Sequence, residues 1–254
     1  MTDLHCHILP GIDDGARNPD ISIQLLRKEL QDGVNQIVLT PHFNCERETV
    51  PEFHKKRRRG VMDLAPALSE NAIKVDFKLA GEVYFSPELP NLDLKGLCIS
   101  GTNILLVELP VDYNPGWTRD ILFELQMQNY RILLAHVERY PYVLEHPEML
   151  YDLVEAGVYT QVNAADVLHK PRETQALRNI IGANLVHVMA TDAHSVHRRP
   201  PLMGEGLAQI RHWFGERMEK RMIENADLIF KGQAPRLLGE PRIPKNGFHL
   251  FGGL

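Results

Sequence analysis

Two histidines separated by one residue, His5 and His7, lie in a short apolar segment near the start of the chain. If this segment is a β-strand, side chains two residues apart point to the same face, so both imidazoles can converge on one point. Imidazole pairs of this kind form one half of many metal sites. A Pro-Gly turn at 10–11 follows, and Asp13 and Asp14 then place carboxylates in the loop above the strand.

Short apolar segments that predict strands alternate with amphipathic segments that predict helices. The predicted strands are 2–7, 36–40, 74–82, 103–109, 131–136, 159–163 and 185–191, and the predicted helices are 20–32, 51–70, 118–129, 146–156, 172–182, 203–214 and 216–226. Seven strand-then-helix units favour a parallel sheet. No Gly-rich dinucleotide fingerprint follows the first strand, which favours a barrel over a doubly wound sheet. We therefore predict an α/β fold, a distorted (β/α)7 TIM-like barrel in a single domain.

No linker or shift in composition divides the chain, so we expect one domain over residues 1–234. Residues 235–254 are rich in Gly and Pro and predict an irregular C-terminal extension, packed on the surface through Phe248, Leu250 and Phe251. The segment 84–102 has no clear helical pattern and predicts a small hairpin or an active-site loop.

Composition restricts the classes of protein that fit. The 254 residues are 44% hydrophobic and 24% charged, as in ordinary globular proteins, and the formal net charge of -5 argues against a general nucleic-acid binder. No apolar run is long enough for a membrane span or resembles a leader segment. Three widely spaced cysteines do not suggest a disulfide framework, so we expect a cytoplasmic protein with Cys6 packed behind the site.

Polar residues stand at the carboxyl end of every predicted strand. In (β/α) barrels the active site is built from these positions. Any one such residue has an ordinary explanation as a satisfied polar group or a helix cap. A ring of them in one cavity is costly unless metal ions neutralise the charges. The candidate ligands are His5, His7, Asp14, His42, Glu82, Glu108, His136, Asp192 and His194.

Nine ligands are too many for one tetrahedral or octahedral ion and suit two or three ions that share carboxylates. Imidazole and carboxylate ligands without thiolate suit manganese, iron or zinc. Such metals act as Lewis acids and convert bound water to hydroxide, which is a usual route to phosphate-ester hydrolysis.

The motifs that carry these residues resemble those of the polymerase-and-histidinol-phosphatase (PHP) superfamily. Within it, the chain resembles the bacterial metal-dependent tyrosine-protein phosphatases of capsule and exopolysaccharide loci. The similarity runs from residue 2 to about 234, and its motifs lie at 3–15, 39–44, 81–84, 106–110, 135–140, 161–164, 191–194 and 198–201.

The resemblance implies a three-metal site that usually holds manganese, with iron and zinc as alternatives. Its implied ligand sets are His5, His7, Glu82 and Asp192; Glu82, Glu108 and His136; and Asp14, His42 and His194. Arg139 and Arg199 match family arginines that bind phosphate, which suits the bidentate fork of a guanidinium. Tyr140 is expected to line the substrate pocket.

We therefore expect a protein-tyrosine phosphatase that acts by direct attack of a metal-activated hydroxide on phosphotyrosine. The expected substrate is the tyrosine autokinase of a polysaccharide-export system. A cysteine-nucleophile phosphatase is excluded, because no cysteine is followed six residues later by arginine. Two alternatives stay open at this point: another PHP phosphoesterase, acting on histidinol phosphate or nucleic-acid ends, and an inactive metal-binding regulatory module.

A dense basic run, residues 55–59, lies in the second predicted helix. Its simplest interpretation is a solvated helix face. The alternative is a docking surface for an acidic, phosphotyrosine-bearing partner or for a neighbouring subunit. The sequence leaves the oligomeric state open.

Overall fold

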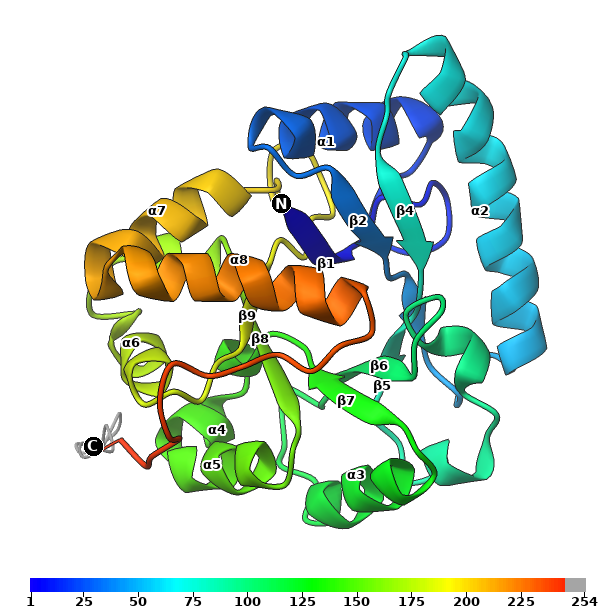
Figure 1. Ribbon diagram of the computed structural model, residues 1–254. Helices are drawn as coiled ribbons and strands as arrows, with labels where there is room; N and C mark the ends of the chain where they lie inside the picture. Colours follow the sequence, from blue (N-terminus) through cyan, green and yellow to red (C-terminus); the bar gives the residue numbers. More distant parts are fainter. Residues whose placement is uncertain (245–254) are drawn as a thin grey trace, which may run out of the picture.

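Parallel strands form the centre of the molecule, and helices surround them (Figure 1). The computed structural model describes residues 1–244; Phe248, Leu250 and Phe251 lie outside the described residues. The strands are β1 (Thr2–Cys6), β2 (Gln36–Leu39), β3 (His42–Phe43), β4 (Asp76–Leu79), β5 (Glu82–Tyr84), β6 (Ile104–Glu108), β7 (Arg131–Leu134), β8 (Tyr159–Asn163) and β9 (Val188–Ala190).

The strands close into a distorted barrel. One sheet has the order β1-β2-β4 and the other β3-β5-β6-β7-β8-β9, and all pairs are parallel. The last strand returns to the first, because the backbone N–H of Asp192 donates to the carbonyl of His5 at 2.8 Å. The N–H of His7 in turn donates to the carbonyl of Ala193 at 2.9 Å. The predicted α/β fold with parallel strands is confirmed.

One predicted strand is followed directly by a further short strand, and another is interrupted. The segment 36–40 continues past Pro41 as β3, and the segment 74–82 breaks at Ala80–Gly81 into β4 and β5. Pro41 has no N–H to continue the ladder, although its carbonyl still accepts a hydrogen bond from the N–H of Glu82 at 3.0 Å. Counted with these breaks, the seven predicted strand positions are all present.

The helices lie where the amphipathic pattern predicts them, with differences at their ends. They are α1 (Pro19–Gln31), α2 (Val50–Glu70), α3 (Thr118–Met127), α4 (Pro141–Glu145), α5 (Pro147–Glu155), α6 (Gln175–Gly182), α7 (Met203–Phe214) and α8 (Glu216–Phe230). The short helix α4 was not predicted. The segment 84–102 contains two 3-10 turns, Leu89–Asn91 and Lys95–Leu97, and no hairpin.

Helix α8 closes the amino-terminal end of the barrel (Figure 1). Its residues Ala226, Ile229 and Phe230 join one buried apolar cluster with inward-facing strand residues such as Leu4 and Leu106. A second, larger cluster fills the space between the strands and the outer helices. With one end filled by apolar side chains, the polar residues at the carboxyl ends of the strands face the opposite, open end.

The described part of the C-terminal segment, 235–244, contains no helix or strand. The N–H of Arg242 donates to the carbonyl of Ala183 at 3.0 Å, and the N–H of Arg236 donates to Asn225 Oδ1 at 2.8 Å. The proposed boundary at 234 stays a prediction. Among the described residues, no helix has the length and apolar content needed to cross a bilayer.

Candidate metal centre

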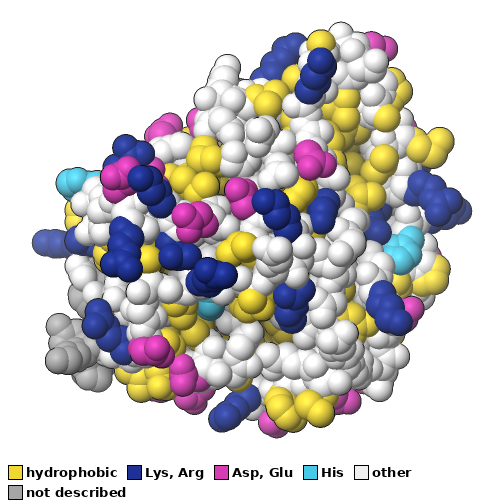
Figure 2. All heavy atoms as spheres, viewed as in Figure 1, with side chains coloured by type: hydrophobic (Ala, Val, Ile, Leu, Met, Phe, Trp, Pro, Cys, Tyr) yellow, Lys and Arg dark blue, Asp and Glu magenta, His cyan; other side chains and the backbone are white. Residues whose placement is uncertain are grey.

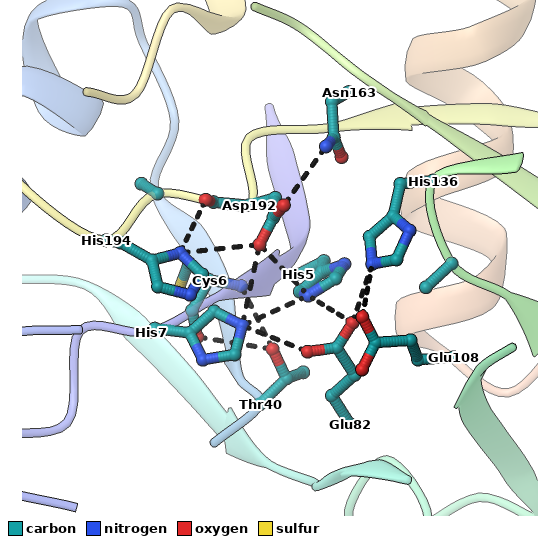
Figure 3. Close-up of polar contacts among 12 residues, drawn as sticks. His5, Cys6, His7, Thr40, Glu82, Glu108, His136, Asn163, Asp192 and His194 are labelled. Atoms are coloured by element: carbon teal, nitrogen blue, oxygen red, sulfur yellow. Dashed lines mark hydrogen bonds and ion pairs between the residues drawn. The ribbon is translucent and has the colours of Figure 1, made fainter. Parts of the chain in front are cut away.

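The structure brings all nine predicted ligands into one linked cluster at the carboxyl end of the barrel. Figure 3 labels all of them except Asp14 and His42. His5 is on β1, His42 opens β3, Glu82 opens β5 and Glu108 ends β6, so four of the nine are strand residues. The remaining five lie in the segments that immediately follow strands: His7, Asp14, His136, Asp192 and His194.

Glu82 is the central carboxylate of the cluster and is fully buried. Its oxygens lie 3.3 Å from His5 Nε2, 3.2 Å from His7 Nε2, 2.9 Å from His42 Nδ1 and 2.9 Å from His136 Nε2. Burial alone would raise the pKa of Glu82, but the surrounding imidazoles hold it well below its usual value. The carboxylate is therefore charged and faces several ligand nitrogens at once.

Asp192 is the second buried carboxylate. Its Oδ1 lies 3.4 Å from His5 Nε2, 3.5 Å from His7 Nε2 and 3.4 Å from His194 Nδ1. The amide of Asn163 donates to its other oxygen at 3.0 Å. The two oxygens therefore have different surroundings, one facing imidazoles and the other facing hydrogen-bond donors (Figure 3).

Three residues form the open side of the cluster. Asp14, 67% exposed, lies 3.5 Å from His42 Nε2 and 3.3 Å from His194 Nε2 through Oδ1. Glu108 Oε1 lies 3.5 Å from His136 Nε2. A cavity of about 890 Å³ adjoins this side, with Tyr84 among its lining residues. A ligand can therefore enter past Asp14, His42 and Glu108.

Two of the site residues have unusual backbone conformations. His136 has φ 29° and Asp192 has φ 51°, a region that residues with a Cβ rarely adopt. Gln161 contacts two of the candidate ligands. Its Oε1 accepts from the N–H of His136 at 2.9 Å and lies 3.1 Å from His5 Nδ1. Strain of this kind persists where surrounding contacts hold it, as they do here.

Asp13, to which the sequence assigned no role, orients an imidazole of the cluster. Its Oδ2 lies 2.7 Å from His7 Nδ1 and accepts from the N–H of His42 at 3.1 Å, while Oδ1 accepts from the N–H of Gly15 at 3.0 Å. These contacts direct Nε2 of His7 into the cluster. Carboxylate partners on the outer nitrogen of a ligand histidine are common in metal sites. An acidic residue in the loop after His7 could therefore have been predicted to hold that histidine.

A buried acidic pair supports the backbone beneath the site. Asp3 Oδ1 accepts from the N–H of Thr191 at 2.9 Å, and the Thr191 hydroxyl lies 2.6 Å from Asp3 Oδ2 and 3.1 Å from Glu29 Oε1. Burial raises the pKa of both carboxyls, and the proximity of Asp3 raises that of Glu29 further. This pair was not predicted, because Asp3 lies on β1 and Glu29 on α1, and two acids on separate elements leave no local sequence pattern.

The two arginines predicted to bind phosphate converge on one oxygen. Arg139 Nη1 donates to Asp192 Oδ2 at 2.7 Å, and Arg199 Nη2 donates to the same atom at 2.6 Å. Arg139 Nε also donates to Asp166 Oδ2 at 3.3 Å. The arginine side chains are 32% and 36% exposed, so both can reach a ligand at the mouth of the cluster.

The expectation that Tyr140 lines the substrate pocket is wrong. Its side chain is fully buried, its hydroxyl donates to the carbonyl of Ala135 at 2.9 Å, and the N–H of Leu109 donates to that hydroxyl at 2.9 Å. Tyr140 thus joins the chain after β6 to the chain after β7, and it holds these segments behind the cluster. Cys6 is buried as predicted, with Sγ 3.5 Å from the carbonyl of Val38.

The imidazoles differ in their affinity for protons. Burial disfavours the charged form of His7, yet Asp13 and Glu82 raise its pKa to about 9. His42 follows the same pattern with Asp14, Glu82 and Glu108, which raise its pKa to about 11 against the effect of burial. Burial and His7 lower the pKa of His194 to about 3.

The arrangement fits divalent metal ions. Three buried atoms without a hydrogen bond among the described residues face the cluster, Glu82 Oε2, Asp192 Oδ1 and His194 Nε2. Unpaired buried polar atoms are rare, and bound ions are one explanation for them. The ligand atoms that lie within 4.8 Å of one another form three groups: His7, Asp14, His42 and His194; His5, His7 and Asp192; and His42, Glu82 and Glu108.

These groups overlap the ligand sets that the resemblance implies, but all three differ from them. His7 joins Asp14, His42 and His194. Glu82 is absent from the group of His5, His7 and Asp192, and His42 takes the place of His136 beside Glu82 and Glu108. His42 therefore lies between two groups, with one ring nitrogen toward each.

Imidazoles and carboxylates gathered at the carboxyl end of a parallel α/β barrel are typical of metal-dependent barrel hydrolases, and this chain has that arrangement. Residues 1–231 match the family described as "Capsular polysaccharide synthesis, CpsB/CapC", and the chain belongs to that family. The family-level resemblance expected from the motifs is confirmed.

Similar proteins cover almost the whole chain. Tyrosine-protein phosphatase YwqE of Bacillus subtilis is 32% identical over 99% of both proteins. Tyrosine-protein phosphatase CpsB of Streptococcus agalactiae is 28% identical over 91% of this chain and 98% of its own. A solved structure from work on YwqE from Bacillus subtilis and CpsB from Streptococcus pneumoniae, described as metal-dependent tyrosine phosphatases, matches with a TM-score of 0.87 and 30% identity. It covers 97% of this chain and 100% of that chain.

Proposed function

We propose that this protein is a metal-dependent tyrosine-protein phosphatase that hydrolyses phosphotyrosine. The observation that carries the proposal is the convergence of unpaired buried ligand atoms and two partly exposed arginines at one end of the barrel. The full-length similarity to proteins named tyrosine-protein phosphatases supports the same activity.

The proposed metal ligands are the nine residues of the cluster: His5, His7, Asp14, His42, Glu82, Glu108, His136, Asp192 and His194. We assign manganese as the metal, with iron and zinc as the alternatives that this ligand chemistry admits. Bound divalent metals supply positive charge beside a phosphoryl group and lower the pKa of a bound water.

The chain itself contributes binding and orientation. Arg139 and Arg199 bind the phosphoryl oxygens, exchanging their contacts with Asp192 for contacts with the substrate. Asp166 holds Arg139 in place through Nε while Nη1 is exchanged. Asp13 and Gln161 keep the rings of the inner imidazoles directed into the cluster, so that the ligand atoms are in position before substrate arrives.

The proposed substrate is the autophosphorylated tyrosine kinase of a polysaccharide-export system. The family's description as a capsular polysaccharide synthesis family supports this assignment. Such a substrate implies that the protein acts in the cytoplasm.

Hydrolysis assays with phosphotyrosine, phosphoserine and histidinol phosphate test the proposal. The protein is first stripped with a chelator, and manganese, iron or zinc is then added back. We expect hydrolysis of phosphotyrosine to be lost on chelation, restored best by manganese, and reduced at least about 100-fold in His136→Ala. Preference for histidinol phosphate would indicate the other phosphoesterase activity, and absence of hydrolysis with every metal would indicate a regulatory module.

A further inference from the structure

A groove of about 810 Å³ runs between helix α2 and the loop that follows β1. Arg17 contributes from the loop side, and Lys55, Lys56 and Arg59 contribute from α2. Figure 2 shows Lys and Arg side chains standing out from the right-hand edge of the molecule, where Figure 1 draws α2. The protein as a whole has a net charge of -5, so this basic lining is a local feature.

The acidic residues of the groove do not neutralise it. Glu52 is engaged in the cap of α2, where its carboxylate accepts from the N–H of Thr49 at 2.8 Å. Asp63 lies 3.9 Å from Arg59, and both side chains are mainly exposed. Within residues 1–244, neither Arg17 nor Lys55 forms an ion pair with an acidic side chain.

The groove adjoins the cavity on the open side of the candidate metal centre. Lys56 lines both this groove and the cavity beside Asp14, His42 and Glu108. It also forms an ion pair of 2.6 Å with Glu48, which fixes its position between the two hollows. A chain segment bound in one hollow can therefore continue into the other.

Gly60 keeps helix α2 against the site loop. A Cβ at this position would lie 2.7 Å from Ile12 Cδ1 and 3.4 Å from the carbonyl of Pro10, so the absence of a side chain lets α2 and this loop approach closely. Because the same loop carries Asp13 and Asp14, the basic face of α2 has a fixed position relative to the site.

The basic run at 55–59 divides into residues with different roles. Arg57 is structural: its guanidinium donates to the carbonyls of Ala80 at 2.7 Å and Gly96 at 2.9 Å. Arg58 is exposed and is not part of the groove lining, whereas Arg59, its neighbour in sequence, lines the groove. Lys55, Lys56 and Arg59 of the run therefore line the groove, whereas Arg58 faces solvent.

We propose that this groove binds an acidic stretch of the substrate polypeptide adjacent to the phosphotyrosine. The proposal rests on the phosphatase function proposed above and adds a determinant of substrate choice. Charge complementarity supports it, because carboxylates of a peptide leaving the cavity past Lys56 meet Arg17, Lys55 and Arg59. Charges at the rim of a site act mainly on association and specificity. The groove therefore lowers KM for acidic phosphopeptides and has little effect on kcat.

Charge reversal with a matched neighbour tests the proposal. The variants are Arg59→Glu, Lys55→Glu/Arg59→Glu and the control Arg58→Glu, which makes the same change on the same helix outside the groove. The substrates are a phosphotyrosine peptide flanked by Glu and Asp, the same peptide with Gln and Asn, and p-nitrophenyl phosphate. We expect KM for the acidic peptide to rise about fivefold in Arg59→Glu and at least about tenfold in the double variant. We expect Arg58→Glu to stay within about twofold of the unaltered protein, and high salt to weaken the preference for the acidic peptide.

The assay separates the groove from the chemistry. Equal effects of Arg58→Glu and Arg59→Glu, or equal KM values of the unaltered protein for the acidic and neutral peptides, would overturn the groove proposal while p-nitrophenyl phosphate hydrolysis continues. A changed sedimentation coefficient in Arg59→Glu with unchanged peptide KM would assign the groove to a second copy of the chain and also overturn it. Failure of the unaltered protein to hydrolyse any of the three substrates would overturn the phosphatase function as well.

Discussion

Oδ2 of Asp13 lies 2.7 Å from Nδ1 of His7, and this contact determines which ring nitrogen of His7 faces the cluster. The neighbouring Asp14 is 67% exposed and faces His42 and His194 instead. Two adjacent acids in one loop thus do different things: one orients a ligand from behind, and the other is positioned to be a ligand itself.

Removing the carboxylate of Asp13 is expected to weaken metal binding. In Asp13→Ala, His7 loses the partner that orients its ring, so metal affinity should fall about 10- to 100-fold. Asp13→Asn keeps an oxygen that can accept from the ring N–H of His7, so its metal affinity should lie between those of Asp13→Ala and the unaltered protein. Metal titration of the stripped proteins measures the effect. An unchanged affinity in Asp13→Ala would show that the contact does not position His7.

The arginine pair should respond to loss of geometry as well as loss of charge. Lysine keeps the charge and loses the planar fork, so we expect kcat/KM for phosphotyrosine to fall about tenfold in Arg139→Lys or Arg199→Lys. The corresponding alanine variants should lose about 100- to 1,000-fold. Arg217→Ala, on helix α8, is the control and should be unaffected. Equal rates in the lysine variants and the unaltered protein would argue against bidentate phosphate binding.

Metal binding should release protons. In the metal-free protein the pKa of His7 is about 9 and that of His42 about 11, so both rings are charged at pH 7.5. Ligand nitrogens must be unprotonated, and we expect release of about two protons per chain and an affinity that rises with pH up to about 11. Titration calorimetry in two buffers of different ionisation enthalpy measures the release. Identical heats in both buffers would contradict it.

The raised pKa of His7 also makes the stability of the metal-free protein depend on pH. The pKa of His7 is raised above its ordinary value of 6.5. The ion contacts of its charged form therefore stabilise the fold fully below about pH 6.5, and this contribution is lost as pH rises through about 9. Denaturant unfolding of the stripped protein between these pH values should show falling stability, and the metal-loaded protein should not share that trend.

Tyr140 should affect stability and leave substrate binding unchanged. Tyr140→Phe leaves the N–H of Leu109 without an acceptor and the carbonyl of Ala135 without its donor, so we expect a loss of about 1–3 kcal/mol in the free energy of unfolding. KM for p-nitrophenyl phosphate should stay within about twofold. A raised KM with unchanged stability would restore Tyr140 to the substrate pocket.

The sequence predicts the barrel and the cluster because both follow from short-range patterns. Alternation places His5 and His7 on one face, and barrel geometry gathers strand-end residues such as Glu108 and His136. The candidate ligands are therefore visible without coordinates. Which ligands share an ion is a matter of distances across the barrel, and the sequence does not contain that information, as the position of His42 between two groups shows.

The errors have a common physical origin in local backbone geometry and long-range burial. The break at Pro41 and the positive φ of Asp192 depend on contacts with distant segments. Tyr140 follows a site motif, yet its side chain turns into the core to reach a carbonyl and an N–H from other segments. Asp13 was missed because a turn residue and a ligand-orienting residue have the same appearance in sequence.

The central claim is that the cluster holds metal ions on which phosphotyrosine hydrolysis depends. The most direct measurement is elemental analysis of the protein during stepwise addition of manganese after chelation, with hydrolysis of a phosphotyrosine peptide measured on the same samples. We predict no activity in the stripped protein, activity that rises with bound metal, and saturation at two to three ions per chain. Full activity in protein that contains no metal would contradict the account.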